Sequence, residues 1–250
     1  MPFVQRFLQF LAIYIIGVGI LWGVKYSFGL SDYLIPSPFE LLDMAATDGL
    51  RDLLAAANTM LVAVAGHFIA VLLATAVAII GRSSTWAGSL TRMAAYNLQA
   101  YPVVAIAPII FLFLGDGLAS RLLIASLICY FPLLLSFIGI FSQPVDEVEH
   151  FFKATGRLTI SLELKIRIFE NLDKLITVIV GSGTTAMVGT IVAEFLAATQ
   201  GVGYVIRKAL YQSNLAKILI ALFLIGLFSS IYLSLLEGCG KLVKKRVTGI

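Results

Sequence analysis

The residues of this chain that could do chemistry are few and lie far apart. The two histidines fall in different surroundings: His67 lies in a long uncharged run and His150 in the most charged segment. Catalysis requires a nucleophile, a base and an orienting group that converge on one reacting atom, and no spacing here brings such groups together. We therefore expect no catalytic set and no metal site. His67 is expected to be packed and hydrogen-bonded, and Cys129 and Cys239 to be packing residues.

The segment GSGTTAMVGT, residues 181–190, comes nearest to a phosphate-binding loop. A Walker A loop requires a lysine after its glycines, and this segment has none, so we expect the chain itself to bind no nucleotide. Small residues instead allow two membrane helices to approach closely. We expect close packing along a central pathway, with Thr184 and Thr185 as polar lining that faces either the pathway or a neighbouring helix.

The composition is that of a membrane protein. Hydrophobic residues make up 60% of the chain and charged residues 13%, whereas soluble domains carry about 25% charged residues. Uncharged runs of about 18 residues or more are candidate spans, and helices are the default because each satisfies its own backbone in lipid. The expected fold class is an all-α membrane protein, with a single transmembrane domain over 1–250. Six membrane spans are expected, at about 7–28, 55–81, 90–114, 120–143, 174–198 and 215–238.

The distribution of Lys and Arg predicts the orientation. Six spans leave both termini on one face, which holds twelve of the 18 basic residues, including those of the tail KLVKKRV. Basic residues mark the cytoplasmic side. We therefore expect a multi-pass membrane protein with both termini and the loop 144–173 in the cytoplasm. The first apolar run is expected to be an uncleaved span. On the outer face, Ser37 is expected to cap a short surface helix that starts at Pro38.

Three residues within the predicted spans are candidates for the translocation pathway or its gate. Pro102 and Pro108 should kink the third span and free backbone carbonyls. Glu194 is an acidic residue set apart from the charged loops, and ionisable groups in spans are costly. It is expected either to pin the turn at 201–203 by accepting hydrogen bonds or to contact the substrate.

The largest block of charge is internal, with eleven charged residues among the 29 from Asp146 to Lys174. Val148, Phe151 and Phe152 form an apolar face at helical spacing, and Gly156 is a candidate helix C-cap. Residues 158–168 fit a strand or a helix; we expect a helix, because a lone strand has no partner. This helix–Gly–helix element either lies on the lipid surface or docks a cytoplasmic partner. The candidate docking residues are Glu149, His150, Phe151, Phe152, Lys153, Ala154, Gly156 and Arg157.

Several stretches resemble one family across most of the chain. HFFKATG (150–156) has the register of a Glu-Ala-Ala loop motif, with Gly156 in place and His150, Phe151 and Phe152 at the Glu-Ala-Ala positions. Three further segments are similar to segments of that family: IPSPFELL (35–42), YPVVAIAPIIFLFLGDGLASRLLI (101–124) and GTIVAEFLAATQGVGYVI (189–206). The chain thus resembles the membrane permease subunit of type I ATP-binding-cassette importers, in the branch with nitrate, sulfonate, taurine and thiamine-precursor permeases.

The resemblance implies a set of partners. The charged loop would be a coupling helix seated on a cytoplasmic ATPase dimer, which would hold ATP and Mg. A second permease copy or a paralogue, an extracytoplasmic solute-binding protein and membrane lipid would complete the surroundings, with no nucleic acid. The first alternative is an ion-coupled secondary transporter or channel subunit, which should show several mid-membrane ionisable residues. The second is a polytopic membrane enzyme.

Overall fold

The structure, a computed structural model, describes residues 2–83 and 85–249 and contains only helices among them. The all-α expectation is confirmed, including a helix rather than a strand after Gly156. The helices are α1 (Pro2–Phe28), α2 (Pro38–Gly81), α3 (Trp86–Gln99), α4 (Val103–Leu114), α5 (Leu118–Ser142), α6 (Asp146–Ala154), α7 (Ile160–Glu170), α8 (Leu172–Leu196), α9 (Val202–Tyr211) and α10 (Leu215–Thr248).

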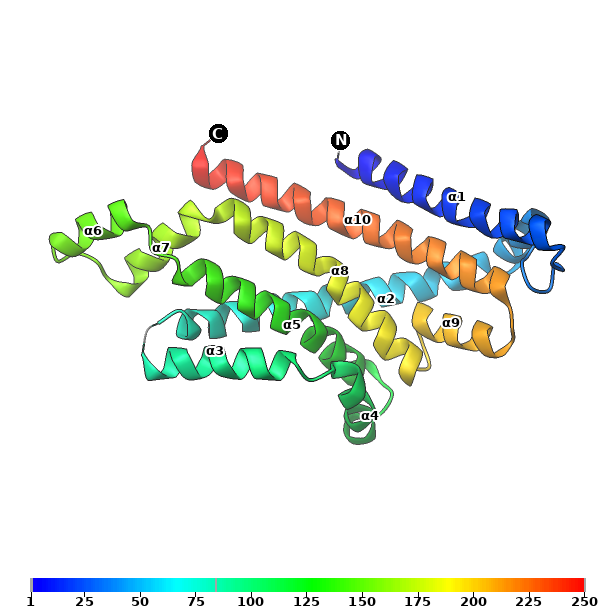
Figure 1. Ribbon diagram of the computed structural model, residues 1–250, viewed down its shortest axis with the longest axis horizontal. Coiled ribbons are helices and arrows are strands. Elements are labelled where there is room, and N and C mark those ends of the chain that lie inside the picture. The colour runs from blue at the N-terminus through cyan, green and yellow to red at the C-terminus, as the bar shows by residue number, and fades with distance from the viewer. Residues whose placement is uncertain (1, 84, 250) are drawn as a thin grey trace.

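The long helices form an elongated bundle (Figure 1). Among the described residues, α1, α2, α5, α8 and α10 are long and apolar enough to cross a membrane, and α3 with α4 gives a sixth crossing if the bent pair is counted as one. α6 and α7 project from one end of the bundle, and α9 lies toward the other (Figure 1). The first and last helices run side by side in opposite directions, and Arg6 of α1 pairs with Glu237 of α10. The C-terminus lies nearer to α6 and α7, while the N-terminus lies near the middle of the long axis (Figure 1).

The expected third span, 90–114, is not one helix. The helical conformation is interrupted between α3 and α4, and the axes of these two helices meet at 90°. Pro102 is the N-cap residue of α4 and takes an extended backbone. A proline has no N–H to donate and disfavours helical geometry in the residue before it, so the kink expected at Pro102 becomes a full break. Pro108 lies inside α4, which continues through it as one helix.

The expected short surface helix at residue 38 is the beginning of a much longer one. Ser37 caps it as predicted: its Oγ accepts from the N–H of Glu40 at 3.3 Å, and the Glu40 carboxylate accepts from the N–H of Ser37 at 2.9 Å. However, α2 then continues for 44 residues to Gly81. At 1.5 Å per residue its length is about 66 Å, about twice the hydrocarbon core of a bilayer. Part of α2 therefore extends beyond the membrane.

Small residues allow the central helices α2, α5 and α8 to pack closely. Gly66 of α2 lies against Ala125 of α5, where an added Cβ would come within 3.0 Å of the alanine Cβ. Gly189 of α8 lies against Ile128 of α5, with only 3.1 Å for a Cβ. Side chains at these positions would push the helices apart. The close packing expected for the segment 181–190 is therefore present on α8.

Candidate functional site

The element formed by α6 and α7 is built by two local signals. Gly156 ends α6 in the left-handed region, at φ +67°, and the N–H of Arg157 donates to the carbonyl of Phe152 at 2.9 Å. Glycine adopts this conformation without steric cost, and such bonds satisfy the last carbonyls of a helix. Thr159 then caps α7, because its hydroxyl oxygen accepts from the N–H of Leu162 at 3.2 Å. The predicted helix–Gly–helix is confirmed.

A buried arginine fixes this element to the bundle. Arg167 of α7 donates from Nε to Oε1 of Glu149 on α6 at 2.6 Å and from Nη2 to Oε2 at 2.9 Å. Its Nη1 donates to the carbonyl of Phe141, near the end of α5. Glu163 lies 3.0 Å from Arg167 and also pairs with Arg82, which follows α2, at 2.5 Å. A displacement of α6 must therefore be shared by α7, α5 and the end of α2.

The charge state of Glu149 depends on this contact. Its hydrogen bond with Arg167 holds the pKa of the Glu149 carboxyl below its ordinary value of 4.5 despite partial burial, and the same bond raises the pKa of Arg167. A carboxyl group whose pKa is lower in the folded state stabilises the fold at pH values above its unfolded-state pKa. This stabilisation is lost as the pH falls through the folded-state pKa. The attachment of α6 is therefore expected to weaken when the pH falls below the ordinary pKa of a glutamate side chain.

We predict that α6 loosens when the pH is lowered from about 6 to about 3. Spin labels at Lys153→Cys and Lys245→Cys, in a Cys239→Ser background, would report the distance between α6 and α10. The distribution should broaden in acid and recover on return to neutral pH. In Glu149→Gln, which has no carboxylate to protonate, the distribution should already be broad at about pH 6. An equal acid response in both variants would assign the change to another group than Glu149.

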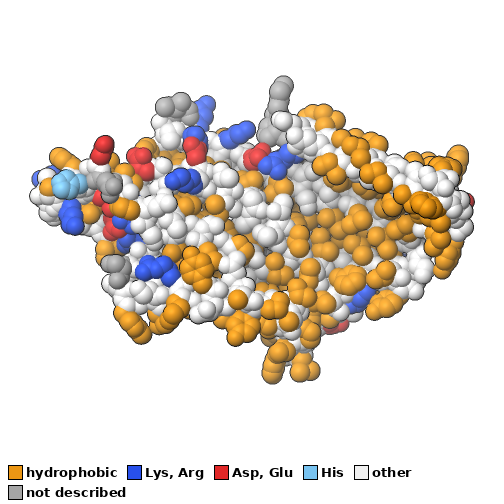
Figure 2. Space-filling view, in the orientation of Figure 1, with side chains coloured by type: hydrophobic (Ala, Val, Ile, Leu, Met, Phe, Trp, Pro, Cys, Tyr) orange, Lys and Arg blue, Asp and Glu red, His pale blue; other side chains and the backbone are white. Residues whose placement is uncertain are grey.

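The predicted docking residues divide between an exposed surface and the internal attachment. Phe151 is 61% exposed and touches the half-buried Phe152, with ring centroids 5.4 Å apart. Glu149 is instead buried and turned toward Arg167. Figure 2 shows acidic and basic side chains gathered mainly at this end of the molecule, while the opposite half of the same face is largely apolar. The other exposed residues of this surface are His150, Lys153, Ala154, Gly156 and Arg157.

A second cluster lies toward the opposite end, around Glu194 of α8. Its side chain is fully buried and accepts from the Thr59 hydroxyl of α2 at 2.7 Å and from the N–H of Gly203 of α9 at 3.0 Å. Arg121 of α5 pairs with it and also donates to Oδ1 of Asn58 at 2.7 Å. One carboxylate thus connects four helices.

The turn before α9 is shaped to fit this carboxylate. Gly201 has φ +91°, and a Cβ at that position would collide with the carboxyl group of Glu194. The N–H of Val202 donates to the Thr59 hydroxyl at 2.8 Å. The hydrogen bond expected between Glu194 and this turn is present. Sequence reasoning missed Arg121; its place directly before a long uncharged run was the available signal.

The other pathway candidates do not join this cluster. Thr184 donates to the carbonyl of Gly181 at 2.6 Å, and Thr185 to that of Ser182 at 2.7 Å. Both hydroxyls thus bond to their own helix. Thr184 is ten residues before Glu194 on the same helix, about 15 Å along its axis. Pro102 and Pro108 belong to the bent α3–α4 pair, whose Ala107 and Ile110 pack beside Ala193. The five predicted residues therefore do not form a single site.

His67 links three helices inside the bundle. Its side chain is 2% exposed, and its ring nitrogens lie 2.5 Å from the Tyr232 hydroxyl of α10 and 2.8 Å from the Ser182 hydroxyl of α8. The expectation of a packed, hydrogen-bonded histidine is confirmed.

Comparison with known proteins gives consistent matches. The family model described as "binding-protein-dependent transport system inner membrane component" matches residues 70–249. A probable ABC transporter permease protein of Haemophilus influenzae is 30% identical over 112 residues, 44% of this chain and 45% of that protein. The formylaminopyrimidine transport permease protein ThiX of Halalkalibacterium halodurans is 25% identical over 129 residues, 52% of each chain. The riboflavin transport system permease protein RibX of Chloroflexus aurantiacus is 30% identical over 136 residues, 52% of this chain and 49% of its own. This chain thus spans about half the length of the curated relatives that it matches.

Proposed function

Because this chain belongs to the family of binding-protein-dependent transport system inner membrane components, we propose that it is the membrane-spanning permease subunit of an ATP-driven importer. It would form a translocation pathway for a small solute delivered by an extracytoplasmic binding protein. Two copies, or this chain and a paralogue, would enclose the pathway. ATP and Mg would be bound by a cytoplasmic ATPase dimer and not by this chain.

The observation that carries the proposal is the attachment of α6 and α7. The two short helices present Phe151 outward and are tied inward through Arg167 to α5 and through Glu163 to Arg82. α8 begins at Leu172, two residues after α7 ends. Transport driven by a separate motor requires a rigid lever with two positions. A partner that grips the exposed surface of α6 would thus move three crossing helices together.

The ion pairs within the bundle favour an ATP-driven permease subunit over an ion-coupled transporter. Such a transporter needs ionisable residues that change state along an ion path. Glu194 is instead paired with Arg121 and satisfied by Thr59 and Gly203. Its arrangement supports a fixed joint between helices. The positive-inside distribution of Lys and Arg supports a cytoplasmic position for α6, α7 and both termini.

The proposal is tested by a cysteine at position 153. In a Cys239→Ser background, which leaves only the buried Cys129, Lys153→Cys should react with a membrane-impermeant maleimide in inside-out vesicles and not in right-side-out ones. Saturation with the cognate ATPase, recognised by its Walker A sequence, should slow the reaction at least tenfold, because docking covers α6.

The matched control is Tyr211→Cys, at the far end of the bundle, where Tyr211 is 83% exposed. Its labelling should have the opposite sidedness and should be unaffected by the ATPase. Reaction of Lys153→Cys in right-side-out vesicles would reject the orientation. An unchanged rate with saturating ATPase would reject α6 as the docking element.

A further inference from the structure

A cavity of about 430 Å³ lies at the end of the bundle opposite α6 and α7. Its walls come from the first half of α2, the turn at 199–201, α9 and the start of α10. Pockets that hold small molecules commonly measure about 300–1,000 Å³ and combine apolar walls with a few convergent polar groups. The volume is therefore sufficient for a small solute, and the charges in its wall indicate which kind.

The two acidic residues of the cavity share a single lysine. Asp48 and Asp52 of α2 both pair with Lys217 of α10, and the Lys217 Nζ lies 3.0 Å from Oδ2 of Asp52. Asp52 is 1% exposed, so its carboxylate faces the lysine and not the open space. This ion triad joins α2 to α10, and its lysine offsets one of the two negative charges.

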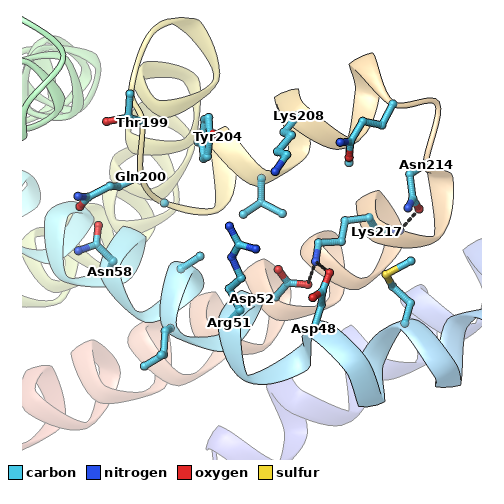
Figure 3. Close-up of a pocket in the computed structure, with 17 residues that line it drawn as sticks. Asp48, Arg51, Asp52, Asn58, Thr199, Gln200, Tyr204, Lys208, Asn214 and Lys217 are labelled. Carbon is cyan, nitrogen blue, oxygen red and sulfur yellow. Dashed lines mark hydrogen bonds and ion pairs between the residues drawn. The ribbon is translucent and has the colours of Figure 1, made fainter.

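Two basic residues remain without a counter-charge in contact. Arg51 of α2 and Lys208 of α9 point toward one another across the cavity (Figure 3). Neither makes a hydrogen bond or ion pair with any residue in 2–83 or 85–249. Like charges that face each other repel unless an anion lies between them. The charge of Asp48 acts on both cations from a distance, but no carboxylate among the described residues contacts Arg51 or Lys208, so the space between these two residues can take an anion.

Neutral hydrogen-bonding groups surround this space. Over the part of the chain that the structure describes, the side-chain hydroxyl of Thr199 and the amides of Gln200 and Gln212 make no hydrogen bond. The Tyr204 ring forms part of the wall, with the guanidinium of Arg207 5.4 Å from its centroid. These groups could bind the uncharged body of a ligand whose anionic group contacts the two basic residues.

We infer that this cavity binds a small soluble solute that carries an oxyanion, such as a carboxylate, sulfonate or phosphate group, between Arg51 and Lys208. The inference deepens the proposed importer function. It rests on that function in one respect, namely that the bound solute is the one transported. Charge-assisted hydrogen bonds from two cations would hold the oxyanion. The surrounding amides and hydroxyls would select the remainder of the molecule.

Monofluorophosphate is a suitable probe, because its fluorine resonance broadens on binding to a large particle. The complete chain in phosphatidylcholine nanodiscs, without any ATPase, should broaden the probe signal saturably, and inorganic phosphate should displace it. Arg51→Gln and Lys208→Gln should each weaken binding about tenfold. Lys245→Gln removes a cation near the C-terminal end of α10, away from the cavity, and should bind the probe as tightly as the unsubstituted protein does.

Each outcome decides the inference. Saturable binding that both cavity variants weaken supports it. Binding that is absent, or equally strong in Arg51→Gln, Lys208→Gln and Lys245→Gln, overturns it. If phosphatidylglycerol in the nanodiscs abolishes the Arg51-dependent binding, the site belongs to a lipid headgroup, which also overturns a soluble ligand. Protection of Lys153→Cys by the ATPase tests the proposed function independently, so the two can fail separately.

Discussion

Replacing Glu194 with alanine is expected to destabilise the folded chain by about 3–5 kcal/mol, because a buried ion pair broken on one side leaves an uncompensated charge. Arg121, 4% exposed, would lose its charged partner and keep only Asn58, and the Thr59 hydroxyl and the Gly203 N–H would lose their acceptor. Unfolding titrations in mixed detergent, followed by the helical circular dichroism signal, would measure the change. The loss should also release α9, since its first turn rests on this carboxylate.

Two further variants separate pairing from mere side-chain loss. Glu170→Ala removes an exposed glutamate at the end of α7 and should change the free energy of unfolding by less than about 0.5 kcal/mol. The double variant Arg121→Met, Glu194→Met removes both charges and fills the space with apolar groups, so it should recover much of the loss. If Glu194→Ala unfolds no more easily than Glu170→Ala, the carboxylate does not join these helices.

Local signals in the sequence predicted local structure well. The helix cap at Ser37, the C-cap glycine Gly156 and the helical spans in the long uncharged runs each depend on neighbouring residues, and each appears in the structure. The break at Pro102 was only partly predictable. A proline removes a donor and crowds the preceding turn, but the packing of the two flanking helices decides whether the result is a kink or a 90° turn.

The partners of charged residues were the main omission. The sequence marked Glu194 as a costly buried charge, yet Arg121 is 73 positions away along the chain, and no local spacing connects them. Glu149 was grouped with the exposed residues of α6, although its partner Arg167 turns it inward from 18 positions later. Helical periodicity assigns side chains to faces of one helix. It does not show which other helix covers a face, so ion pairs between helices require the fold.

Replacing Arg167 with alanine is expected to abolish most ATP-driven uptake while leaving the membrane bundle folded. The variant removes the bidentate contact with Glu149 and the hydrogen bond to the Phe141 carbonyl. Without them α6 has no rigid connection to α5, so a displacement at the docking surface would dissipate locally. Uptake in proteoliposomes, for a solute that stabilises the cognate binding protein against heat, should fall at least tenfold, while ATP hydrolysis by the attached ATPase continues.

The separation of hydrolysis from uptake distinguishes a lever from a merely structural residue. Lys165→Ala removes an exposed cation from the same helix and should leave both rates unchanged. Arg167→Lys keeps the charge but cannot make the planar two-point contact, so its uptake should fall between the other two. Loss of uptake and hydrolysis together, with the ATPase released from the membrane, would mean that Arg167 only shapes the docking surface. Uptake at the original rate in Arg167→Ala would show that force enters the bundle by another route, and the direct junction of α7 with α8 at residues 171–172 would be the first place to look.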